Sequence, residues 1–91
     1  MFRGCQNKGF HMTFENGWTI SVQWGRDNYC QVVEVTESSV TAKNAEIAVW
    51  HADGSDLALS VSGAGNWIDS NDVAKWIFDV SEMERPGGDT L

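Results

Sequence analysis

Residues 10–24 read FHMTFENGWTISVQW, and they carry the strongest structural signal in the chain. Apolar and polar residues alternate with a period of two on both sides of residues 15–17, as they do in half-buried β-strands. A three-residue loop at 15–17 places the apolar side chains of both strands on one face, whereas a two-residue loop would place them on opposite faces. The predicted partners are Phe10 and Val22, Met12 and Ile20, and Phe14 and Trp18. The sequence therefore predicts a β-hairpin with Gly17 in the left-handed conformation.

Further strands are expected along the middle of the chain. A short strand is predicted over roughly residues 29–35. Residues 45–49 and 57–61 alternate again on either side of a turn-forming stretch. Pairing Val49 with Leu59 gives a second hairpin whose apolar residues share one side.

The period changes from two to helical near the C-terminus. The apolar positions of this segment are Val73, Trp76, Ile77 and Val80. Their spacing marks one face of a helix. Asp69 or Ser70 can cap its start, and Pro86 ends it at or before Arg85.

Together these elements predict an α+β fold: an antiparallel meander sheet of four or five strands, with one C-terminal helix packed on one face. The chain has 91 residues, which is enough for one domain. We expect this domain to span residues 1–85, with an irregular start over residues 1–8, and residues 86–91 to form a flexible tail.

The charge is unevenly distributed. Residues 1–45 are neutral overall, whereas residues 46–91 carry nine acidic residues against Lys75 and Arg85, which accounts for the net charge of −7. Such a surface repels nucleic-acid phosphates and anionic lipid, so we expect no direct nucleic-acid binding and no membrane contact. It suits a basic partner, or it serves as a solvated surface.

Four residues are the candidates for a binding site: Trp24, Asn28, Tyr29 and Trp67. Five tryptophans are many for this length, and Trp18 and Trp76 are expected in the core. An exposed tryptophan beside polar residues can anchor a partner or stack on a ligand. The outward face of the first hairpin carries neutral polar side chains. Two interpretations stay open: the face is only solvated, or the exposed strand edge beside it pairs with another chain, such as a second copy in a homodimer.

Signals for catalysis and metal binding are weak. Cys5, His11, Cys30 and His51 have no metal-ligand spacing, so no metal and no cofactor is expected. A Cys30–His dyad is conceivable, but no sequence signal brings the two side chains together. Two cysteines make no disulfide framework, and the N-terminus has no signal-peptide pattern. We therefore expect a cytoplasmic protein with reduced thiols that is not an enzyme.

Residues 9–25, followed by Asn28-Tyr29-Cys30, resemble small uncharacterised proteins of tailed phages, especially cyanophages, and of some bacteria. The resemblance covers about the first third of the chain. That family has no assigned activity, so no residue role is carried over. What the resemblance implies is an accessory factor that engages a host protein in the host cytoplasm. The alternative hypothesis is a module that binds a small ligand through its aromatic residues.

Overall fold

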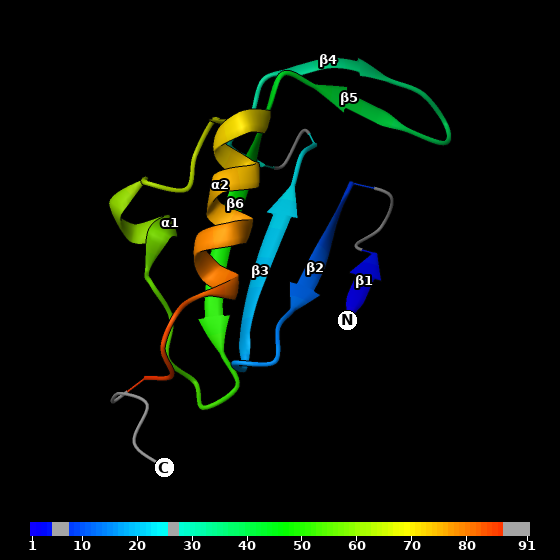
Figure 1. Cartoon of the computed structure of the whole chain (residues 1–91). Helices are drawn as coiled ribbons and strands as arrows, with labels where there is room; N and C mark the ends of the chain where they lie inside the picture. Colours follow the sequence, from blue (N-terminus) through cyan, green and yellow to red (C-terminus); the bar gives the residue numbers. More distant parts are fainter. Residues whose placement is uncertain (5–7, 26–27, 87–91) are drawn as a thin grey trace.

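The computed structural model describes residues 1–4, 8–25 and 28–86. Its main sheet has five strands, β1 (Phe2–Gly4), β2 (Gly9–Thr13), β3 (Trp18–Gln23), β6 (Asn44–His51) and β7 (Ile68–Asp69). The remaining elements are β4 (Val32–Val35), β5 (Val40–Ala42), α1 (Leu59–Ser62) and α2 (Ser70–Ser81). All strand pairs are antiparallel, and α2 lies across one face of the sheet (Figure 1). The predicted α+β fold, with a five-stranded antiparallel sheet and a C-terminal helix on one face, is confirmed.

The first hairpin has the predicted register. Met12 pairs with Ile20, and the backbone N–H of Phe14 donates to the carbonyl oxygen of Trp18 at 2.9 Å. Gly17 has a φ of 86°, the left-handed conformation that the three-residue loop requires. The loop geometry therefore sets which face of both strands is apolar.

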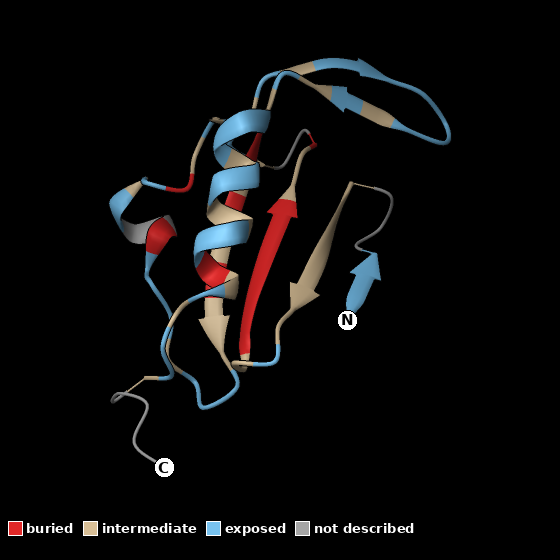
Figure 2. Cartoon of the chain, in the orientation of Figure 1, coloured by how far each residue is buried: buried red, intermediate tan, exposed pale blue. Residues whose placement is uncertain are grey.

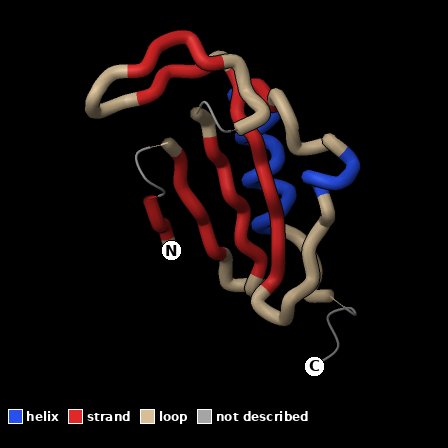
Figure 3. Tube along the Cα trace, turned by 180° about the vertical axis from the view of Figure 1, so that it is seen from behind, coloured by secondary structure: helices blue, strands red, loops and turns tan. Residues whose placement is uncertain are grey.

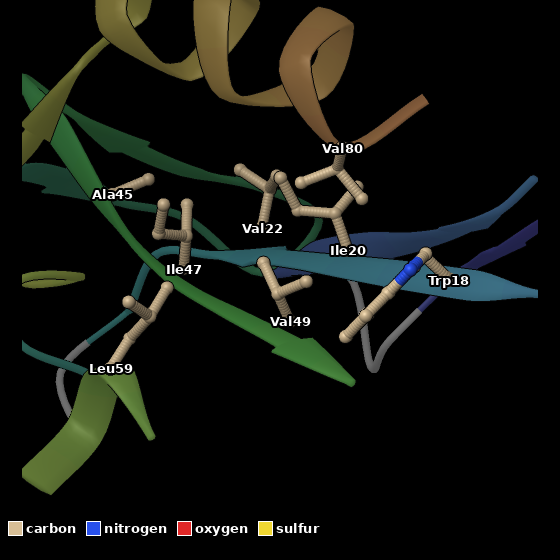
Figure 4. Close-up of a cluster of buried hydrophobic side chains, with 8 residues drawn as sticks. All are labelled: Trp18, Ile20, Val22, Ala45, Ile47, Val49, Leu59 and Val80. Atoms are coloured by element: carbon tan, nitrogen blue, oxygen red, sulfur yellow. The ribbon is translucent and has the colours of Figure 1, made fainter. Parts of the chain in front are cut away.

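The core lies between β3, β6 and the two helices, as Figure 4 shows. Ile20, Ile47 and Val80 are its largest fully buried side chains. The other buried apolar residues are Trp18, Val22, Ala45, Val49 and Leu59. Because successive strand residues point to opposite faces, the core residues of β3 and β6 all face α2.

α2 buries the face predicted for it. Val80 is fully buried, and Val73, Trp76 and Ile77 pack against the core. Asp69 occupies the N-cap position, although its side chain makes no capping hydrogen bond. The helix ends at Ser81, before Pro86. Residues 87–91, most of the predicted tail, lie outside the described residues.

The strand order departs from a simple meander. β6 lies next to β3, and the intervening chain forms the separate hairpin β4–β5. This hairpin projects from one end of the sheet, and most of its residues are exposed (Figure 2). The strand predicted over 29–35 is therefore shorter than expected and does not join the main sheet.

The prediction of a strand over residues 57–61 is wrong. The Leu57 N–H does donate to the Val49 carbonyl oxygen, as in a hairpin. The chain then turns at Ala58, whose φ is 52° and whose N–H donates to the Asp56 carboxylate, and it continues as α1. Local hydrogen bonding by Asp56 competes with the strand ladder at this point. Helix α1 places Leu59 in the core.

The expectation of an irregular start over residues 1–8 is wrong for residues 2–4, which form β1. Residues 5–7 of that segment lie outside the described residues. Strand β1 pairs with β2 in the register Arg3 to His11. Without β1, the outer edge of β2 would have unpaired backbone N–H and C=O groups. Pairing with these groups explains why a mixed polar segment forms a strand here.

Candidate binding site

Glu46 anchors the chain that follows β3. It lies between the core residues Ala45 and Ile47, so its side chain points to the face of the sheet opposite α2. Its carboxylate accepts hydrogen bonds from Asn28 Nδ2 at 3.1 Å and from the backbone N–H of Tyr29 at 3.3 Å. Hydrogen bonds to an ionised group are stronger than neutral ones. Glu46 therefore fixes Tyr29 beside β6.

Tyr29 and Trp67 form an exposed aromatic pair. The Trp67 N–H donates to the Tyr29 carbonyl oxygen at 2.9 Å. The ring centroids lie 5.7 Å apart, with an angle of 70° between the planes, which is a favourable edge-to-face arrangement. Tyr29 is 58% exposed and Trp67 is 56% exposed. Two large rings are thus presented at the surface in a fixed relation.

The backbone of Trp67 is strained. Its φ of 53° is a conformation that bulky residues rarely adopt and that costs about 1–2 kcal/mol. The preceding turn holds it in place, because the Gly65 carbonyl oxygen accepts a hydrogen bond from the Ile47 N–H at 2.8 Å. Strained residues held by their surroundings are concentrated at functional sites, which supports Trp67 as a candidate.

Trp24 lies apart from this pair, on the α2 side of the sheet. Its indole N–H donates to the Val40 carbonyl oxygen at 2.8 Å, and its ring packs edge-to-face on Phe10. It also lines a cavity of about 270 Å³ between the sheet and the start of α2. The apolar lining of that cavity consists of Phe10, Val22, Trp24, Ala42, Ala45, Ile68 and Val73.

The structure therefore brings together three of the four predicted residues, Asn28, Tyr29 and Trp67, and separates Trp24 from them. Glu46 also belongs to this candidate site, although no sequence pattern predicted it. The sequence feature that could have pointed to Glu46 is that it is the acidic residue in the alternating apolar stretch 45–49. That signal indicated an outward side chain but not its hydrogen-bond partners.

The conceivable Cys30–His dyads do not form. The Cys30 thiol contacts the backbone of Gly25, with its sulfur 3.3 Å from the Gly25 nitrogen, at the far end of β3. The His51 ring packs on Trp18, at the opposite end of that strand, and its Nε2–H donates to the Asn16 carbonyl oxygen. Five residues of β-strand span roughly 17 Å. His11 contacts Arg3 and Trp50 instead.

Most acidic residues of the second half are exposed. They are Asp53, Asp56, Asp69, Asp72, Asp79, Glu82 and Glu84. A hydrogen bond from Ser55 holds the pKa of Asp53 below its usual range. On α2, Lys75 pairs with Asp79 at 2.7 Å, which raises the pKa of Lys75. Exposed pairs of this kind contribute little to stability, so the main effect of these charges is a negative surface.

Comparisons with family models, curated proteins and solved structures found no match to the chain. Within residues 1–4, 8–25 and 28–86, no three His, Cys, Asp or Glu side chains gather as metal ligands would. No helix in this part of the chain has the length and apolar character needed to cross a bilayer. The geometry of the site is therefore the basis for the functional argument.

Proposed function

We propose that this chain is a non-enzymatic binding protein that holds a protein partner through Tyr29 and Trp67. The observation that carries the proposal is the exposed, edge-to-face pair of rings held by the Trp67–Tyr29 hydrogen bond. Tyr and Trp are the residue types that contribute most to protein interfaces. Rings already ordered in the free protein lose little conformational entropy on binding.

The charge of the protein favours a partner with a basic contact surface. The negative surface of the second half attracts such a partner over distances of about 10 Å at 0.1 M salt. The resemblance of residues 9–25 and 28–30 to small phage proteins supports an accessory role, with a host protein as the partner in the host cytoplasm.

The test measures the affinity for a partner captured from the lysate of the producing cell. Trp67→Ala and Tyr29→Ala should each weaken binding about 30-fold, the effect of losing about 2 kcal/mol at an interface hot spot. Phe78→Ala is the matched control, because Phe78 is another aromatic residue, 63% exposed, on the outer face of α2. If all three variants bind the partner as tightly as the native chain does, the aromatic pair is not the contact surface.

A second candidate function is the binding of a small apolar ligand beside Trp24. The cavity of about 270 Å³ supports it, because its lining is mostly apolar. Native mass spectrometry of gently purified, untagged protein tests this function through a mass excess above the chain mass. The same spectrum tests a homodimer, which we propose would pair through the outer edge of β1.

A further inference from the structure

The face of the sheet opposite α2 carries a polar cluster that the proposed function does not use. In Figure 3, which shows this face, α2 lies behind the sheet. His11 of β2 and Trp50 of β6 meet across β3, with ring centroids 5.0 Å apart at an angle of 83°. Between them, Thr19 is 8% exposed and Ser21 is 4% exposed. The face predicted to be solvated is therefore partly covered by its own side chains.

A cavity of about 190 Å³ opens in this cluster. It is lined by Met1, Arg3, His11, Thr13, Thr19 and Trp50. Its volume corresponds to about six water molecules, at roughly 30 Å³ each. Drug-sized ligands occupy about 300 Å³ or more, so this cavity suits a small group.

The polar lining is arranged to receive negative charge. Arg3 carries a permanent positive charge, and among the described residues those that line the cavity include no acid. The hydroxyls of Thr13 and Thr19 lie 2.8 Å apart, so one donates to the other. Their contact uses one of the two hydroxyl protons, and the other can donate to a bound oxygen.

His11 orients the Arg3 guanidinium. Arg3 pairs with His11 across β1 and β2, and its Nη2 contacts His11 Nδ1. Burial, and then the charge of Arg3, lower the pKa of His11. The ring is therefore neutral at neutral pH, and its Nδ1 accepts from the guanidinium while Nε2 carries the proton.

We propose that this cavity binds a small oxyanion, the carboxylate or phosphate group of a small molecule. Arg3 supplies the charge, the threonine hydroxyls supply neutral donors, and the Trp50 ring packs against an apolar part of the ligand. The net charge of −7 opposes the approach of anions, so we expect dissociation constants in the millimolar range.

The test is an NMR titration that follows the indole N–H of Trp50 and the ring of His11. The probes are acetate, benzoate and inorganic phosphate, each compared with sodium chloride at matched ionic strength. Saturable shifts at both residues are expected. Benzoate binding more tightly than acetate would place the aromatic part of the ligand on Trp50, and a response to phosphate alone would identify a phosphate site.

Two variants decide whether Arg3 carries the binding. Arg3→Gln should weaken it about tenfold or more, because a charged hydrogen bond is lost at an exposed residue that the core does not need. Lys75→Gln makes the same change of charge on α2, on the other side of the sheet, and should leave the affinity within about twofold. Shifts no larger than those with chloride, or equal binding by Arg3→Gln and the native chain, would overturn the proposal.

Discussion

Asn16 shows how one turn residue connects the two halves of the chain. Its Nδ2 donates to the carbonyl oxygens of Val80, Ser81 and Met83, at 2.9–3.2 Å. Its Oδ1 accepts from the Trp18 N–H at 3.0 Å. The last carbonyls of a helix have no partner within the helix. Asn16 supplies one, so the first hairpin caps the end of α2.

At this residue we predict that Asn16→Ala lowers the free energy of unfolding by about 1–3 kcal/mol, because the three carbonyls lose the hydrogen bonds from Asn16 Nδ2. Asn16→Asp should cost more, since a carboxylate would face these carbonyls at the negative end of the helix dipole. Urea unfolding measures both. Asn71→Asp makes the same chemical change in the first turn of α2, where negative charge is favourable, and should not destabilise the protein. Equal losses for Asn16→Asp and Asn71→Asp would contradict the capping role.

At the scale of elements, the segment between β6 and α2 covers the outer edge of β6. Leu57 donates to Val49, and Ile47 donates to the Gly65 carbonyl oxygen. Because the edge of β6 is covered, it does not pair with other chains. The exposed edge of the sheet is the short strand β1, on the opposite side. The same segment positions Trp67 beside Tyr29.

Gly65 is the position where this covering is tightest. A Cβ on Gly65 would lie 2.3 Å from the Ile47 carbonyl oxygen. We expect Gly65→Ala to lower the free energy of unfolding by about 1–3 kcal/mol, because the segment must move away from β6. Gly4→Ala is the control, since a Cβ there meets nothing within 4 Å. Denaturant unfolding of the two variants should separate them clearly, and a stable Gly65→Ala would mean that the segment is loosely attached.

At the scale of the whole molecule, stability is unevenly distributed. The molecule measures 48 × 25 × 22 Å, and the β4–β5 hairpin extends from one end (Figure 1). The Trp24 indole, which donates to the Val40 carbonyl oxygen, ties this hairpin to the body. The buried residues lie instead in β3, β6 and the segments that pack on them (Figure 2).

Hydrogen exchange should reproduce this division. We expect the amides of β3 and β6 to exchange only through global unfolding, and those of β4 and β5 to exchange several orders of magnitude faster, because few buried contacts hold the hairpin. NMR exchange rates in native buffer measure the difference. Similar rates for Ile20 and Thr41 would show that the hairpin is part of the cooperative core.

Local patterns in the sequence are enough to predict the first hairpin, its register and α2. Residues 10–24 and 73–80 have a clear period, and the contacts that this period predicts are close along the chain. The sequence also indicated Asn28, Tyr29 and Trp67, together with Trp24, as candidates for a binding site. Over residues 57–61, the alternation was too short to exclude a helix, and the Asp56 side chain favoured a turn.

Contacts between residues far apart in the sequence depend instead on the tertiary structure. Glu46 with Tyr29, Tyr29 with Trp67, and Asn16 with the end of α2 are contacts between segments that no local pattern relates. Such contacts depend on how the sheet twists and where the helix lies on it. The period of a strand specifies the face on which a side chain lies, but the partner across space is set by the packing of the whole chain.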